Sequence, residues 1–344
     1  MGKRSIGDND VDLMARNRAY STSCLRTLSF SANSGIENIP AILLDGARVL
    51  HVLDLSRTGI SSLPACVGNL KLLRVLNLSK TNITEVPECL KSNKSLRFLD
   101  ISNCRSLQQF PQWIGELNCL EHLDICRCSK KSMPKGISKL VSLQVLKLVE
   151  DNTLSVEENE SFKLEHFVNL VNLREVWINL DHEVELKSIE NGILATLVKM
   201  RLLTIVNYVD DNLSPPLSEK MLAMKDLEFL SLRRLEVPDW ICGFSNLMHL
   251  ELFDCHCAEY PALEMMPNLI KIHLDGNRNC KALPKGFGKS GRFPQLRYFI
   301  IDCFSELEEL PELEDGAMPH LEILRVERCC KLTKFQVNLS FWKV

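Results

Sequence analysis

One short apolar pattern recurs along almost the whole chain and constrains its fold more than any other feature. Units of the form Leu-x-x-Leu-x-Leu, such as Leu50-Leu53-Leu55, each predict a short strand that turns its apolar residues to one face. A single strand of this kind cannot bury that face, so we expect successive copies to stack around one continuous core. Thirteen units begin at Leu25, Leu50, Leu73, Leu96, Leu120, Leu143, Leu173, Met200, Leu227, Leu247, Leu269, Leu296 and Leu321.

The units recur about every 25 residues, which is typical of leucine-rich repeats. The spacing predicts an α/β leucine-rich-repeat solenoid (horseshoe) of about 13 repeats, with a curved parallel β-sheet on the concave face. Turns and short helices are expected on the convex side. We assign residues 1–23 to a disordered or capping lead-in and residues 24–344 to the repeat domain. Its repeats are irregular over about 150–235, and Phe335–Val344 ends it as a cap strand or within a further repeat.

Two further sets of residues recur at nearly fixed positions after the predicted strands. Eight residues after the first apolar position come side chains that can satisfy inward-turning backbone groups: Asn33, Thr58, Thr81, Cys104, Cys128, Cys255, Asn277 and Cys329. An apolar residue followed by proline then recurs, as in Leu63-Pro64 and Val86-Pro87. Proline fixes φ and lacks an N–H, so it favours an extended return segment over a regular helix.

Composition excludes several classes of protein. The net charge of −3 argues against general nucleic-acid binding, and no apolar run approaches the roughly 18 residues of a membrane span. The N-terminus carries no secretory signal pattern, so we expect the 14 cysteines to stay reduced in the cytoplasm or the nucleus.

Motifs for catalysis or cofactors are weak. Gly286-Phe-Gly288-Lys289-Ser290 lacks the first glycine of a phosphate loop, because residue 283 is leucine. Cys126-x-Cys128 and Cys255-His256-Cys257 do not have zinc-ligand spacing. The eight histidines are scattered. We therefore expect no enzyme, no cofactor and no metal.

The predicted surface is uneven in charge and side-chain size. Residues 1–150 hold 20 Lys and Arg against 13 Asp and Glu, whereas residues 151–344 hold 21 against 31. Between the second and third apolar positions the early repeats carry Asp54, Asn77, Asp100 and Asp124, and later ones carry larger groups.

Aromatic and arginine side chains dominate protein interfaces. The predicted concave protein-binding residues are Trp177, Phe229, Arg233, His249, Glu251, Phe253, Lys271, His273, Arg297, Tyr298 and Arg325. The alternatives are chance charge drift and simple lateral packing of Phe229 and Tyr298.

The repeat Leu50-His-Val-Leu53-Asp-Leu55-Ser-Arg-Thr58-Gly-Ile60-Ser-Ser-Leu63-Pro64 resembles that of plant intracellular nucleotide-binding leucine-rich-repeat disease-resistance proteins. The resemblance covers about residues 24–335. It implies a non-enzymatic domain whose later repeats sense a pathogen effector or a guarded host protein in innate immunity. It also implies that the first repeats contact a nucleotide-binding module, in cis or in trans, and hold it inactive. The basic residues expected at this autoinhibitory contact are Arg57, Arg74, Lys80, Arg97, Arg105 and Arg127.

Other functions remain open at this level. A free-standing leucine-rich-repeat scaffold could bind a small GTPase or a phosphatase, since such proteins share the Leu-Pro register. An adaptor of a ubiquitin ligase would need a helical segment longer than the lead-in. The ligand, the oligomeric state and the role of the acidic segment 151–171 do not follow from the residues.

Overall fold

The computed structural model describes residues 22–128, 135–148, 164–180, 189, 191–207, 217–255 and 257–334. The predicted end segments 1–23 and 335–344 fall almost wholly outside these residues, as does 151–163 of the acidic segment. Each of the thirteen predicted units contains one strand, and the order in the parallel sheet is the order of the sequence. The strands are β1 (Thr27–Ser29), β2 (Val52–Asp54), β3 (Val75–Asn77), β4 (Phe98–Asp100), β5 (His122–Asp124), β6 (Val145–Lys147), β7 (Glu175–Leu180), β8 (Leu202–Asn207), β9 (Phe229–Arg233), β10 (His249–Phe253), β11 (Lys271–Asp275), β12 (Tyr298–Asp302) and β13 (Ile323–Glu327). The solenoid prediction is confirmed.

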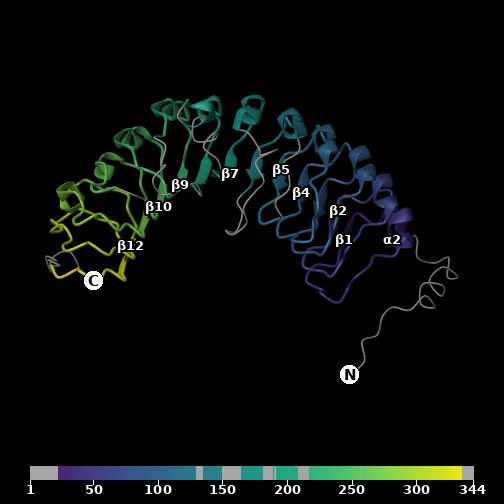
Figure 1. Cartoon of the computed structure of the whole chain (residues 1–344), viewed down its shortest axis with the longest axis horizontal. Helices are drawn as coiled ribbons and strands as arrows, with labels where there is room; N and C mark the ends of the chain where they lie inside the picture. The colour runs from purple at the N-terminus through teal and green to yellow at the C-terminus, as the bar shows by residue number, and fades with distance from the viewer. Residues whose placement is uncertain are drawn as a thin grey trace, which may run out of the picture. The chain divides into compact units, whose positions relative to one another are not determined.

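The chain divides into two compact units, which we describe separately. Unit 1 comprises residues 1–145 and 153–162, and unit 2 comprises 146–152 and 163–344. In unit 1, β1 to β5 pair in parallel with equivalent residues side by side, as in Leu53↔Leu76. In unit 2, β7 to β13 keep the same register. Within each unit the strands line the inner side, and short helices lie along the outer side (Figure 1).

The core of each repeat is made by the residues that the pattern singles out. Leu50, Leu53 and Leu55 have no exposed surface, and the equivalent residues of most other repeats are similarly buried. Fully burying a leucine side chain contributes about 1.5–3 kcal/mol. The repeated leucines therefore supply most of the apolar stabilisation, and adjacent repeats share it.

The inward-turning register satisfies backbone groups, as expected. The hydroxyls of Thr58 and Thr81 donate to the carbonyls of Leu55 and Leu78, at 2.6 and 2.7 Å. Later members reach the preceding repeat: the thiols of Cys104, Cys128 and Cys255 donate to the carbonyls of Leu78, Ile101 and Leu232. Most of the register is buried, whereas Asn33 is exposed and Cys329 is half-buried.

Short 3-10 helices form the return path to the next strand. Pro64, Pro87 and Pro111 each precede such a helix directly, with φ between −67° and −65°. Proline therefore ends the extended segment and starts a single turn. Among the described residues, the helices with defined bounds are η1 (Thr22–Cys24), the α-helix α2 (Ala41–Asp45), η2 (Ala65–Asn69), η3 (Glu88–Ser92), η4 (Gln112–Glu116), η5 (Lys135–Lys139), η6 (Leu164–Asn169), η7 (Ile193–Thr196), η8 (Glu219–Ala223), η9 (Asp239–Gly243), η10 (Leu263–Met265) and η11 (Lys285–Gly288).

The inward-turning polar residues predict which polar substitution will lower the stability of the fold most. Asn277 has no exposed surface. Its amide donates to the carbonyl of Cys257 at 2.9 Å, and its oxygen accepts from the backbone N–H groups of Asn279 and Cys280. Asn277→Ala leaves the buried carbonyl of Cys257 and the buried N–H of Cys280 without this partner, which costs about 3 kcal/mol.

We expect Asn277→Ala to lower the urea midpoint of unfolding clearly, measured by circular dichroism. The neighbouring exposed Asn279→Ala serves as control, because its side chain makes none of these bonds. Equal midpoints for the two variants would contradict the stabilising role of the Asn277 hydrogen bonds.

Candidate protein-binding surface

In unit 2, the strand residues that alternate with the buried ones form three columns on one face of the sheet. The registers place His249 beside Phe229 and Lys271, and Glu251 beside Ser231 and His273. The first column is Glu175, Leu202, Phe229, His249, Lys271, Tyr298 and Ile323. The second is Trp177, Thr204, Ser231, Glu251, His273, Ile300 and Arg325, and the third is Asn179, Val206, Arg233, Phe253, Asp275, Asp302 and Glu327. Ten of the eleven predicted binding residues lie in these columns.

A partly buried ion pair lies at the centre of the columns. The ammonium of Lys271 is 2.6 Å from a carboxylate oxygen of Glu251, and the two side chains are 29% and 16% exposed. His249, two residues before Glu251 in β10, has a pKa below its usual value because of burial and, to a lesser extent, the charge of Lys271. The imidazole is therefore neutral at physiological pH, and the centre carries one balanced pair of charges.

Aromatic rings pack on both sides of this ion pair. The rings of Phe229 and His249 are 6.1 Å apart, and those of Phe253 and His273 meet edge to face at 5.0 Å. For Phe229, this is the lateral packing that the alternative interpretation predicted. The same side chains remain half-exposed on the face of the sheet, so a ligand can still contact them.

Charged members of the predicted set have acidic partners within unit 2. Arg233 lies 3.2 Å from Asp254, and Arg325 lies 3.4 Å from Glu327. Arg297 stands outside the columns, one residue before β12, where its guanidinium pairs with Glu322 at 2.9 Å. The structure therefore places Arg297 at the edge of the strand face.

In unit 1 the equivalent positions serve the backbone. Side-chain oxygens of Asp54, Asn77, Asp100 and Asp124 each accept the N–H of the residue two positions further on, at 2.8 to 3.0 Å. The next residue then adopts a left-handed backbone, with φ of 56° to 59° at Arg57, Lys80, Asn103 and Arg127. These Asp and Asn side chains thus end strands β2 to β5 and turn the chain inward, a role that was not predicted from the sequence.

The six predicted basic residues of unit 1 do not lie together. Arg74 and Arg97 directly precede β3 and β4, whereas Arg57, Lys80 and Arg127 follow their strands at the left-handed position. Lys80 lies six positions after Arg74, a distance of roughly 20 Å along an extended chain. Arg97 also pairs with Glu121 at 2.9 Å. The predicted contact is thus divided between the edge where the chain enters the strands and the edge where it leaves them. Arg105 belongs to the second of these, two residues after the left-handed Asn103.

The cysteine pairs noted in the sequence are packed as small apolar groups. Burial raises the pKa of Cys255 and of Cys257 to about 12, and it raises the pKa of Cys128 as well. A thiol must lose its proton to bind zinc or to act as a nucleophile. These environments oppose that loss.

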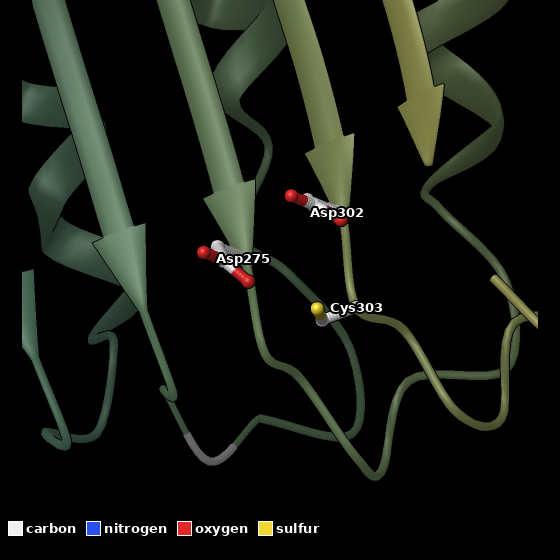
Figure 2. A group of neighbouring side chains, drawn as sticks. All are labelled: Asp275, Asp302 and Cys303. Carbon is white, nitrogen blue, oxygen red and sulfur yellow. The ribbon is translucent and has the colours of Figure 1, made fainter. Parts of the chain in front are cut away.

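One group of potential metal ligands occurs among the described residues (Figure 2). Oxygens of Asp275 and Asp302 and the sulfur of Cys303 lie within 4.8 Å of one another. The guanidinium of Arg328 already donates to both oxygens of Asp302, and this bond lowers the pKa of that carboxyl group. An arginine therefore supplies the positive charge that a cation would bring, and we assign no metal here.

Comparison with known proteins decides the family. The family model of the leucine-rich repeat region matches residues 23–342. The chain belongs to the leucine-rich-repeat family. Among solved structures, an internalin from Listeria monocytogenes superposes with a TM-score of 0.55 at 13% identity, over 92% of this chain and 88% of the internalin. A TDR receptor gives 0.53 at 18% identity, over 91% and 63%. These likenesses concern the fold.

The curated relatives are disease-resistance proteins of Arabidopsis thaliana. The resistance protein RPP8 is 26% identical over 61% of this chain and 25% of its own length. The resistance protein UNI is 25% identical over 98% of this chain and 36% of its own length. This leucine-rich-repeat chain therefore spans about a quarter to a third of these relatives. Among its described helices, none is long and apolar enough to cross a membrane.

The lowered pKa of His249 predicts how acid affects stability. The folded chain favours the neutral imidazole, whereas the unfolded chain titrates near pH 6.5. Stability from this residue is therefore complete above pH 6.5 and is lost as the pH falls below it.

We expect the urea midpoint of the wild-type chain to fall more between pH 7.5 and pH 5 than that of His249→Gln. The other titratable groups are the same in both proteins, so the difference between wild type and variant reports on this imidazole. His320→Gln, at an exposed residue, should behave as wild type. An identical loss in wild type and His249→Gln would show that this imidazole does not titrate as described.

Proposed function

We propose that this leucine-rich-repeat chain is a non-enzymatic recognition domain of a plant disease-resistance protein. Through the columns of unit 2 it binds a pathogen effector or a host protein that an effector modifies. The proposal rests on one observation above all: half-exposed aromatic and charged side chains from β9 to β12 converge around the Glu251–Lys271 pair. The similarity to RPP8 and UNI supports a role in defence. We expect that role in the cytoplasm or the nucleus.

The chemistry of this surface suits a protein ligand. Phe229, Phe253 and Tyr298 offer large area with few rotatable bonds, so their ordering on binding costs little entropy. Around them the charged groups are paired, as in Arg233–Asp254, and they would fix the orientation of a partner more than they raise its affinity. A protein with an apolar projection surrounded by polar groups fits this surface.

The test combines a screen with variants of the surface. The chain is screened pairwise against secreted pathogen proteins, and the affinity of a positive pair is measured by calorimetry. We expect Phe229→Ala or Tyr298→Ala to weaken binding at least about tenfold, as for interface residues that bury a large ring. Arg278→Ala, on an exposed turn, is the control and should leave the affinity unchanged.

Two outcomes would contradict the proposal. A bound effector whose affinity is the same for both ring variants would place recognition elsewhere on the chain. Binding of a small GTPase or a phosphatase that is lost in Phe229→Ala would instead favour the scaffold function.

We further propose that unit 1 contacts a nucleotide-binding module through one of its two basic edges. Arg57, Lys80 and Arg127 share the left-handed position after their strands, so they lie at one edge of the sheet, with Asn103 at the equivalent position between Lys80 and Arg127. A long basic side chain in this conformation is uncommon, because the left-handed region favours glycine and asparagine. Arg74 and Arg97 lie at the opposite edge, directly before their strands. Three of the predicted basic residues share the left-handed position at one edge against two at the other, so the edge with Arg57, Lys80 and Arg127 is the better candidate for an acidic module.

This predicts unequal effects of charge reversal at the two edges. Changing Arg57, Lys80 and Arg127 to Glu should abolish salt-sensitive co-immunoprecipitation with the nucleotide-binding module of a plant resistance protein. Changing Arg74 and Arg97 to Glu should reduce it much less. Equal loss with both sets, or binding that does not respond to salt, would refute the one-edge contact.

A further inference from the structure

A second concave feature of unit 2 lies away from the three columns, at the edge where the chain enters the strands. It is a groove of about 790 Å³, a size that suits a short peptide or a small ligand. We call it the edge groove. Its lining residues are Arg174, Lys199, Arg201, Asp226, Glu228, Asn246, Met248, Asn268, Ile270 and Gln295. The predicted binding residues of the columns do not line it.

The floor of the edge groove is fixed by backbone hydrogen bonds between repeats. The N–H of Arg201 donates to the carbonyl of Arg174 at 2.7 Å, and that of Glu228 donates to Arg201 at 2.9 Å. Met248 bonds to Glu228 and Ile270 bonds to Met248 in the same way, each at 2.8 Å. Each repeat therefore presents one floor side chain, at the strand spacing of about 4.8 Å.

One wall of the edge groove is held by side-chain amides. Asn246 and Asn268 donate to the carbonyls of Lys225 and Ser245 in the preceding repeats, at 2.9 and 2.8 Å. Each amide oxygen then stays available as an acceptor for a ligand N–H. The groove is preformed, so a ligand does not have to order this wall.

Charge is distributed unevenly along the edge groove. Arg201 is compensated by Glu228, whose carboxylate contacts it at 2.5 Å, and Asp226 also lies close enough to act on it. Lys199 bonds to the neutral amide oxygen of Asn172 at 2.7 Å. Neither Lys199 nor Arg174 pairs with a carboxylate of the described chain. The end near β7 is therefore cationic, whereas Met248 and Ile270 make the floor apolar near β10 and β11.

We propose that the edge groove binds an extended peptide segment with a carboxylate at one end and an aliphatic side chain four or five residues away. The carboxylate would meet Arg174 and Lys199, and the aliphatic group would cover Met248 and Ile270. Three strand spacings separate Arg174 from Met248, about 15 Å, which an extended chain of about 3.3 Å per residue spans in four to five residues. The asparagine wall would accept backbone N–H groups of the peptide.

This surface is independent of the proposed effector-binding columns. The columns lie on the face of the strands, whereas the edge groove is lined by residues from before each strand and from the turn that leads into it. A partner with the stated peptide could occupy the groove while the columns hold another protein.

The test uses two labelled peptides of opposite direction, Asp-Ser-Thr-Ser-Leu and Leu-Ser-Thr-Ser-Asp, both with blocked ends. Their binding to the full chain is followed by fluorescence anisotropy at low and high salt. We expect at least one peptide to bind, with weaker binding at high salt. Replacing its Asp by Lys, or its Leu by Ser, should reduce the affinity about tenfold or more.

Variants of the chain locate the binding site. Arg174→Glu and Met248→Asp should each weaken binding about tenfold or more. Matched controls are Arg278→Glu and Met265→Asp, which change the same residue types at exposed positions outside the groove. Retained binding in both groove variants, or no binding of either peptide to the wild-type chain, would overturn the proposal. Loss in Phe229→Ala but not in Arg174→Glu would also overturn it, because the peptide would then occupy the columns.

Discussion

Six repeats of the described chain depend on a buried hydrogen bond where the backbone leaves the sheet and turns inward. Burying the leucines takes backbone carbonyls with them, and a buried carbonyl without a partner is costly. Thr58 and Thr81 satisfy carbonyls of their own repeat, while Cys104, Cys128 and Asn277 reach the preceding one. The stacking of repeats is therefore cooperative, because each repeat completes the hydrogen bonding of its neighbour.

Because these hydrogen bonds lie inside the repeats, the side chains on the strand face are free to differ between the units. In β2 to β5 an Asp or Asn follows the central leucine and caps the backbone beyond it, and these strands are three residues long. In β9 to β12 the same position holds Ser231, Glu251, His273 and Ile300, and the strands extend to five residues. Longer strands present a third column of side chains. The surface suited to recognition therefore coincides with the strands that lack the capping Asp or Asn.

The sequence predicted the strands and the inner ladder well, because both follow from strict periodicity and local chemistry. Position in the columns was also predictable for Phe229 or His273, since residues alternate along a strand. Contacts between repeats were not, because they depend on which side chains become neighbours at equivalent positions. The pairing of Arg297 with Glu322 of the next repeat is one example. The edge groove was missed for the same reason, since no single repeat contains it.

Ion pairs along the entry edge have a regular geometry that bears on how the groove can function. Arg97, Arg201 and Arg297 each pair with a glutamate of the next repeat, at 2.9, 2.5 and 2.9 Å. These side chains are about half exposed, and such pairs typically contribute less than about 1 kcal/mol to stability. The backbone hydrogen bonds between adjacent repeats hold this edge in place instead. Side chains at this edge can therefore be exchanged with little effect on folding, so a change in peptide binding in Arg174→Glu would report on the groove and not on a damaged solenoid.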